Sequence, residues 1–266
     1  MPWDWLWTHR WSSAAGAFAL GLLISAAVVL PVPNRGGSLL AELYLGRLAN
    51  PQILAGRVDA KMFLYLAGAT LLQLHLLSFA AHHLLTYPGD PSPGVMLYVV
   101  LFTWFVCDYL IFERVHLYTY DLFAERLGFK LVWGCLSWYP YFYVVGLWSV
   151  ANLRNPHSPA WLTVLATVLF LAGWSLSRGA NTQKFVFKRD TDRAFLGWLA
   201  PRAFTDGERR VLYSGFWGVS RHVNYLGELL MATGLALSLG WPDEASSCRL
   251  ARIVPANLPD GQTLGA

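Results

Sequence analysis

Residues 62–89 read MFLYLAGATLLQLHLLSFAAHHLLTYPG, and this long stretch contains no Asp, Glu, Lys or Arg. About 20 apolar residues in a helix cross the hydrocarbon core of a bilayer, so the stretch is long enough for a transmembrane helix. The whole chain shares this character, because 55% of its 266 residues are hydrophobic, 14% are charged and its mean hydropathy is +0.40. Soluble domains carry about 25% charged residues. The composition therefore indicates an integral membrane protein.

Stretches without charged side chains recur along the chain. They lie at Trp11–Asn34, Pro91–Cys107, Leu131–Leu153, Asn155–Ser177 and, in a shorter form, Leu229–Pro242. We therefore predict an all-α, polytopic helical membrane protein with about six hydrophobic segments in one domain, residues 1–242. Residues 243–266 are polar and rich in small side chains and turn formers, and we predict a weakly ordered tail there.

The basic residues are distributed unevenly between the predicted segments. Of the 20 Lys and Arg residues, 16 fall in the three loops that follow the first, third and fifth segments. By the positive-inside rule these loops are cytoplasmic, and the N-terminus is therefore outside. The loop from Arg178 to Asn224 is the longest polar stretch, so we expect a soluble ligand to dock there.

The stretch 214–230, SGFWGVSRHVNYLGELL, begins the last hydrophobic segment with many hydrogen-bonding side chains. The rings of Phe216 and Trp217 can cover a heteroaromatic ring, and Asn224 and Tyr225 can pair with an amide. Basic candidates for phosphate binding are Lys184, Lys188, Arg189, Arg209, Arg210, Arg221 and His222. Together these groups suit a phosphorylated dinucleotide, although no GxGxxG motif follows a strand, which excludes a Rossmann site. The alternative is that the basic residues only set the topology and contact anionic lipid.

Ionisable side chains near bilayer depth are candidate proton donors. Asp108, Tyr109, Glu113 and Asp121 lie on or just beyond the third segment. A charge at this depth usually faces a cavity or a partner, and a buried carboxyl can keep its proton and act as an acid. For each carboxylate, an interfacial ion pair with an Arg is the alternative. The cysteines and histidines lack metal-ligand spacing, so we predict no metal site.

Several blocks of the sequence resemble the sterol C14 and C7 reductase family, which includes the delta-14 sterol reductases. The stretch 214–228 contains the family pattern S-G-[WF]-W-G-x-x-R-H-x-N-Y-x-G-[DE], and ANTQKFVFKRD at 180–190 resembles N-x-Q-K-x-x-F-[KR]. FVCDYLIFE, YDLFAERLGFKLVWGCLSWYPYFY, LYLGRLANP and VDAKMF resemble further family segments in the same order. The resemblance covers about residues 43–239.

The resemblance implies a multi-helix reductase that uses NADPH on a sterol ring double bond, of the delta-14 type. It implies a location in the bacterial inner membrane or the endoplasmic reticulum. The positions implied to contact NADPH are Lys184, Lys188, Leu212, Trp217, Asn224 and Tyr225, and Arg221 and His222 belong to the same motif. The implied partners are a sterol and the lipid bilayer, and not nucleic acid, while the oligomeric state stays open.

The implied reaction reduces an isolated alkene, which hydride cannot attack until an acid has protonated it. The site therefore needs a protonated acid, a dry aromatic cavity and a nicotinamide held about 3–3.5 Å from the cationic carbon. Trp138, Tyr139 and Tyr141 are candidates for lining that cavity, because aromatic faces stabilise positive charge. Asp108, Tyr109, Glu113 and Asp121 all stay open as the acid.

The chain departs from the family pattern at a few positions. Phe105 stands where the family has Tyr, Cys135 where it has Asp, and Val223 where many members have Pro. The closing family block is absent, so the chain resembles a C-terminally truncated copy whose cofactor pocket would be incomplete.

Two other functions compete with the reductase. Isoprenylcysteine carboxyl methyltransferases share an R-H-x-x-Y-x-G helix start and bind S-adenosylmethionine there. The Gln183-Lys184 block and the region 108–143 favour the reductase. The third hypothesis is a sterol-binding homologue that has kept the fold and lost catalysis.

Overall fold

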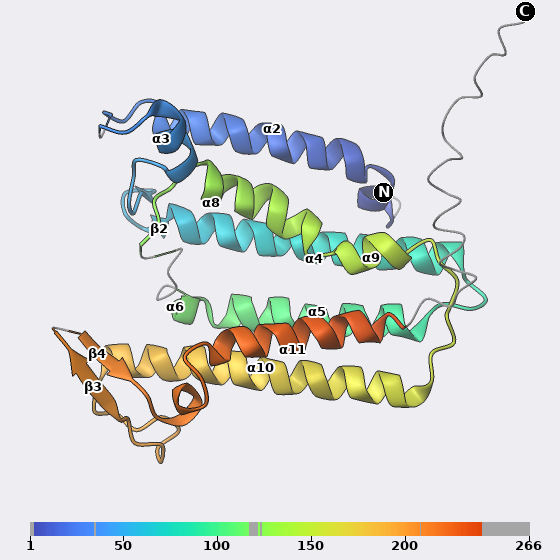
Figure 1. Ribbon diagram of the computed structural model, residues 1–266. Coiled ribbons are helices and arrows are strands. Elements are labelled where there is room, and N and C mark those ends of the chain that lie inside the picture. The colour runs from blue at the N-terminus through green and yellow to red at the C-terminus, as the bar shows by residue number, and fades with distance from the viewer. Residues whose placement is uncertain (1–2, 35, 117–121, 123, 208, 241–266) are drawn as a thin grey trace, which may run out of the picture.

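The computed structural model describes residues 3–34, 36–116, 122, 124–207 and 209–240, and this part of the chain is mostly helical (Figure 1). Four of its helices are long and apolar enough to cross a membrane. They are α2 (Arg10–Val29), α4 (Ala60–Thr86), α5 (Pro93–Ile111) and α10 (Ala160–Arg189). The prediction of a helical membrane protein is confirmed, whereas the count of about six spanning segments is not.

The two remaining hydrophobic segments take other forms. The region 131–153 is divided among α8 (Phe129–Trp133), the π-helix η1 (Gly134–Phe142) and α9 (Val145–Val150). Pro140 lies inside η1, and because proline has no N–H to donate, it interrupts the regular α-helical hydrogen bonding. The last segment, α11 (Val223–Ser238), has 16 residues and is shorter than the about 20 residues of a full crossing.

Short elements connect these helices. They are α1 (Trp5–Thr8), α3 (Leu39–Leu45), β1 (Gln52–Ile53), β2 (Val58–Asp59), α6 (Glu113–His116), β3 (Ala203–Asp206), β4 (Arg209–Leu212) and the 3-10 helix η2 (Gly215–Gly218). The strands β1 and β2 form one antiparallel hairpin, and β3 and β4 form another, in which Ala203 is opposite Leu212. The second hairpin lies beside the C-terminal end of α10 (Figure 1).

The prediction of a loop that begins at Arg178 is wrong, because α10 continues to Arg189. Residues 178–189 contain no proline and a single glycine, so nothing ends the helix where the charges appear. About three further turns are therefore helical. This matters for the site, since Lys184 and Lys188 are held on a helix and not on a loop.

The helices form two groups that meet at α4 and α5 (Figure 1). One group contains α2, α4, α8, η1 and α9, and the other contains α5, α10 and α11. Between them, Leu76 and Phe79 of α4 are fully buried in one cluster with Phe102 of α5 and Leu147 of α9. Burial of such apolar side chains holds the two groups together.

Glycines allow α10 and α11 to pack with their backbones close together. A Cβ atom on Gly227 would lie 2.6 Å from the backbone nitrogen of Ser177, and one on Gly234 would lie 2.6 Å from the carbonyl oxygen of Ala166. A Cβ atom on Gly173 would collide with the carbonyl oxygen of Gly227. Small residues are the usual means by which membrane helices approach closely. We call this close contact between α10 and α11 the seam, and it fixes the start of α11 against α10.

Candidate functional site

The segment that follows β4 is held against α10 by side-chain hydrogen bonds. The amide of Gln183 donates to the carbonyl oxygen of Ser214 and accepts from the backbone N–H of Phe216, both at 3.0 Å. The indole N–H of Trp217 donates to the carbonyl oxygen of Ala180 at 2.9 Å. The predicted cofactor residue Trp217 is therefore fixed on the surface of α10.

Two basic candidates continue along α10 from this contact. Lys184 lies one turn beyond Ala180 and is half-buried, and Lys188 lies a further turn beyond it and is exposed. Residues four apart share one face of a helix. The helix therefore brings the indole of Trp217 and the two ammonium groups to successive turns of α10.

Leu212, another candidate, ends β4 and leads directly into the segment held by Gln183. The hairpin that carries it contacts α10 through Arg210, whose guanidinium carbon lies 5.8 Å from the ring centroid of Phe187. Leu212 thus lies in the same region as the α10 candidates.

The start of α11 carries the remaining candidates. The rings of His222 and Tyr225 stack with their centroids 5.5 Å apart and their planes 20° from parallel. Tyr225 and Arg221 are exposed and Asn224 is half-buried. These four side chains are therefore accessible to a ligand that reaches the start of α11.

Asp108, a predicted proton donor, is paired with Arg178 of α10. The Nε atom of Arg178 lies 3.0 and 2.9 Å from the two carboxylate oxygens, and its Nη2 atom also donates to Oδ2. The side chain of Asp108 is 8% exposed and that of Arg178 is 14% exposed. The guanidinium carbon of Arg178 lies 4.9 Å from the ring centroid of Phe112. Protonation of Asp108 would weaken these charge-assisted bonds. Asp108 therefore forms an ion pair with an Arg, which is the alternative to a protonated, acidic Asp108.

Tyr109, the next residue of α5, lies in an aromatic cluster formed with Tyr65, His116 and Tyr139. Its ring stacks on the imidazole of His116 with 3.6 Å between centroids, and lies 6.4 Å from the ring of Tyr65 and 6.5 Å from that of Tyr139. We name these four residues the Tyr109 cluster. Within the part of the chain that the structure describes, the buried hydroxyl of Tyr139 has no hydrogen-bond partner. The cluster therefore surrounds the ring of Tyr109 with other aromatic side chains.

The imidazole of His116 is neutral at physiological pH. Burial, with a smaller effect from the positive charge of Arg178, lowers the pKa of His116 to about 3. The ring is thus an uncharged face against which Tyr109 packs.

The three aromatic residues predicted to line one cavity lie in different surroundings. Tyr139 belongs to the Tyr109 cluster, whereas Trp138 is 46% exposed and stacks on Phe142 at 4.3 Å. Tyr141 packs against His75, also with 4.3 Å between centroids. Successive residues of a helix point in different directions, so these neighbours cannot share one wall.

The two other candidate acids are Glu113 and Asp121. Glu113 begins α6 and is half-buried. Asp121 lies outside the described residues, as does the predicted tail 243–266.

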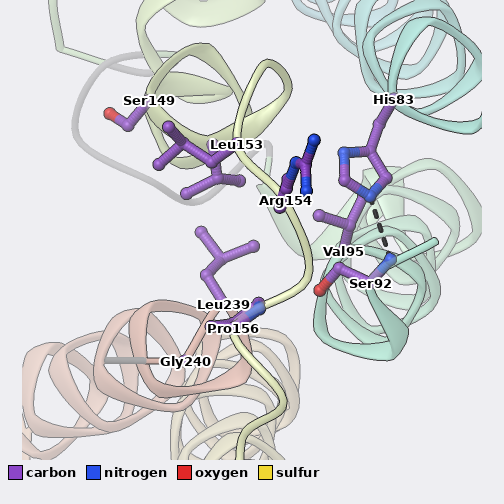
Figure 2. A pocket seen from close by; sticks show the side chains of 10 residues that line it. His83, Ser92, Val95, Ser149, Leu153, Arg154, Pro156, Leu239 and Gly240 are labelled. Carbon is purple, nitrogen blue, oxygen red and sulfur yellow. Dashed lines mark hydrogen bonds between the residues drawn. The ribbon is translucent and has the colours of Figure 1, made fainter. Parts of the chain in front are cut away.

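A cavity of about 120 Å³ lies elsewhere, beside the C-terminal ends of α4 and α11 (Figure 2). His83, Ser92, Arg154 and Leu239 are among its lining residues. The Nε2 atom of His83 accepts from the backbone N–H of Ser92 at 2.9 Å, as the dashed line in Figure 2 shows. None of the predicted site residues lines this cavity.

Comparison with known proteins identifies the family. The profile of the Ergosterol biosynthesis ERG4/ERG24 family matches residues 23–244. The chain belongs to this family. It is 35% identical to the Delta(14)-sterol reductase of Arabidopsis thaliana over 209 residues, which are 78% of this chain and 54% of the relative.

Other relatives agree with this assignment. The chain is 35% identical over 198 residues to the Delta(14)-sterol reductase of Methylotuvimicrobium alcaliphilum, covering 74% of this chain and 45% of the relative. It is 32% identical over 228 residues to the Delta(14)-sterol reductase TM7SF2 of Mus musculus, covering 84% and 52%. The chain spans about half the length of the curated relatives it matches. The resemblance expected from the motifs is confirmed.

The residues that hold the candidates in place were missed from the sequence. From the sequence, Arg178 is only a basic residue of a predicted loop, and Gln183 is only part of a block that resembles the family. A signal was available, because both are polar side chains on a helix that continues without a break from an apolar segment. Such side chains usually need a partner inside the protein.

Proposed function

We propose that this ERG4/ERG24 family chain takes part in the NADPH-dependent reduction of a sterol ring double bond, of the delta-14 type. The observation that carries the proposal is that the indole of Trp217 is bonded to Ala180 of α10, while Lys184 and Lys188 follow on the next two turns of that helix. A planar ring and two ammonium groups at this spacing suit the ring and phosphates of a dinucleotide. The names of the relatives agree with a sterol substrate.

The cofactor residues have distinct proposed roles. Lys184, Lys188 and Arg221 bind the phosphates, since each is a cation at the basic end of the helices. Trp217 packs against a ring of the cofactor, while Asn224 and Tyr225 at the start of α11 pair with polar groups near the nicotinamide. Leu212, at the end of β4, and His222, at the start of α11, are the remaining proposed contacts of the cofactor.

Tyr109 is the proposed proton donor. Asp108 holds Arg178 in a bidentate pair, so we assign it a positioning role between α5 and α10. Tyr109 lies among Tyr65, His116 and Tyr139, and an apolar, aromatic environment of this kind protects a cation from water. Glu113 stays as a candidate of lower rank, because no contact with the Tyr109 cluster among the described residues supports it, and Asp121, which lies outside those residues, stays open as a candidate.

The proposed reaction has two steps. The O–H bond of Tyr109 breaks and its proton forms a C–H bond with one alkene carbon, which leaves a carbocation on the neighbouring carbon. NADPH, when bound, supplies the hydride that quenches this cation. The Tyr109 phenolate then recovers a proton from water.

The proposed setting is a bilayer with the basic end of α10 on the cytoplasmic side and the N-terminus outside. The uneven distribution of Lys and Arg supports this topology. On this view α8, η1 and α9 together carry the chain back across the membrane, because α5 and α10 both end on the cytoplasmic side, whereas α11 is too short for a full crossing.

The experiment that tests the function is incubation of the purified chain with a delta-14 sterol and NADPH. We expect mass spectrometry to detect a product two mass units heavier, formed together with NADP⁺. Because the chain spans about half of each relative, a full-length family member serves as the positive control. NADP⁺ formation without a heavier sterol, or no reaction while the control is active, would contradict an active reductase.

Family membership favours the reductase over the methyltransferase. A thermal-shift comparison in detergent separates them, since NADPH should raise the melting temperature and S-adenosylmethionine should not. A sterol-binding homologue without activity would instead retain sterol on purification and leave NADPH unoxidised.

A further inference from the structure

The side chain of Gln183 makes an unusual double contact with a segment more than 30 residues away in the sequence. It is 2% exposed, its Nε2 donates to the carbonyl oxygen of Ser214, and its Oε1 accepts from the backbone N–H of Phe216. Both distances are 3.0 Å. Because one end of the amide must donate while the other must accept, the contact requires an uncharged amide of this length.

Two glycines allow this segment to pack closely against α10. A Cβ atom on Gly179 would collide with the ring of Phe216, which therefore occupies the space left by the missing side chain. Gly215 has φ +63°, and a Cβ atom on it would lie 2.6 Å from Nε2 of Gln183. Trp217 follows directly and is bonded to the carbonyl oxygen of Ala180. The orientation of the indole is thus set by α10 without any ligand.

We propose that Gln183 is a positioning residue of the cofactor site, which holds Trp217 in its binding orientation before the dinucleotide arrives. The proposal rests on the proposed function, because it takes Trp217 as a cofactor contact. Ordering a side chain on binding costs free energy, and a pre-ordered site avoids that cost. Loss of the amide contact frees the whole segment 214–217. Binding of the dinucleotide must then order several residues, so the free-energy cost of binding rises.

The test is binding of NADP⁺ to the purified chain in detergent, measured by isothermal titration calorimetry. Gln183→Met has a similar volume and removes both hydrogen bonds, and we expect it to raise the Kd at least tenfold. The matched control is Gln73→Met on α4, because the Nε2 of Gln73 donates to Thr103 at 2.9 Å within the α4–α5 contact. It removes a partly buried amide hydrogen bond outside the cofactor region and should leave the Kd unchanged.

A second variant tests the donor and acceptor roles within a single folded protein. In Gln183→Glu, an ionised carboxylate still accepts from Phe216 but repels the carbonyl oxygen of Ser214. Protonation restores a donor, so the ratio of its Kd to the wild-type Kd should fall as the pH is lowered from 8 to 6. The change of this ratio with pH tests the positioning role even if Gln183→Met does not fold.

The outcomes separate the two proposals. Wild-type binding together with an unchanged Kd in Gln183→Met, or with a Gln183→Glu ratio that does not vary with pH, overturns the positioning role alone. A wild-type chain that binds no NADP⁺ refutes the proposed function and the positioning role with it.

Discussion

Asp108 and Tyr109 are consecutive residues of α5 whose side chains contact opposite groups of helices. The carboxylate of Asp108 is bonded to Arg178 of α10, whereas the ring of Tyr109 stacks on His116 and lies near Tyr139 of η1. α5 therefore connects the helix that carries the cofactor candidates to the aromatic cluster. Displacement of α5 would change the distance between the two.

Replacement of Tyr109 by Phe tests the proton donor. The variant keeps the stacked ring and removes the proton, so we expect kcat to fall at least about 100-fold, in line with general acid catalysis. The Kd for NADPH should stay within about twofold of the wild-type value. The matched control is Tyr98→Phe, a buried tyrosine of the same helix whose hydroxyl donates to the carbonyl oxygen of Tyr143 at 3.2 Å. Unchanged kcat in Tyr109→Phe would assign the proton to another group.

The ion pair between Asp108 and Arg178 should contribute to stability as a unit. Asp108→Leu leaves a buried guanidinium without its carboxylate, and breaking such pairs costs about 3–5 kcal/mol. The double variant Asp108→Leu with Arg178→Leu removes both charges and should recover most of that loss. Thermal unfolding in detergent gives the melting temperatures of the wild type, the single variant and the double variant. Equal melting temperatures for the single and double variants would show that the pairing has no stabilising role.

The seam between α10 and α11 predicts a clear effect of adding one methyl group. In Gly227→Ala the new Cβ meets backbone atoms that cannot move aside, so we expect a loss of about 1–3 kcal/mol of stability. Gly16→Ala in α2 is the control, because a Cβ there meets nothing within 4 Å. It should be neutral or stabilise by up to about 1 kcal/mol through helix propensity. A Gly227→Ala protein as stable as Gly16→Ala would contradict the close packing.

Removal of two cations tests the phosphate site. Lys184→Ala combined with Arg221→Ala should weaken NADPH binding by one or more orders of magnitude, since charge-assisted contacts are worth about 1.5–3 kcal/mol each. Fluorescence titration of NADPH measures the change, and a double variant of Arg10 and Arg154 at the other end of the helices is the control. Binding that is equal in both double variants would place the phosphates elsewhere.

The neutral state of His116 predicts a dependence of stability on pH. Its pKa of about 3 in the folded protein lies below the ordinary value of 6.5. Between these values the unfolded chain binds one more proton than the folded chain. The free energy of unfolding therefore falls as the pH is lowered from about 6.5, by up to about 1.4 kcal/mol per pH unit.

Chemical unfolding at pH 7 and pH 5 measures this dependence. The His116→Phe variant should lose that part of the slope, whereas His157→Gln should keep it because the side chain of His157 is 74% exposed. Identical slopes in the wild type and His116→Phe would show that His116 is not held neutral.

Much of the candidate site was predictable because its residues follow one another along the chain. Trp217, Asn224 and Tyr225 share one motif, and Lys184 and Lys188 share another, so each group stays together in any fold. The predicted boundary at Arg178 is wrong, because charged residues alone do not end a helix. A helix ends where its hydrogen bonding is interrupted, and no residue between 178 and 189 interrupts it.

The sequence by itself determined that this is a helical membrane protein of the ERG4/ERG24 family, because apolar length and ordered motifs are properties of the linear chain. Only the tertiary structure decided that Asp108 pairs with Arg178, that Tyr109 joins Tyr139, and that Gln183 holds the segment before Trp217. These contacts join residues more than 30 positions apart or on different helices. Their partners depend on how each helix is rotated against its neighbours, and that rotation is set by close packing such as the contact of Gly173 with Gly227.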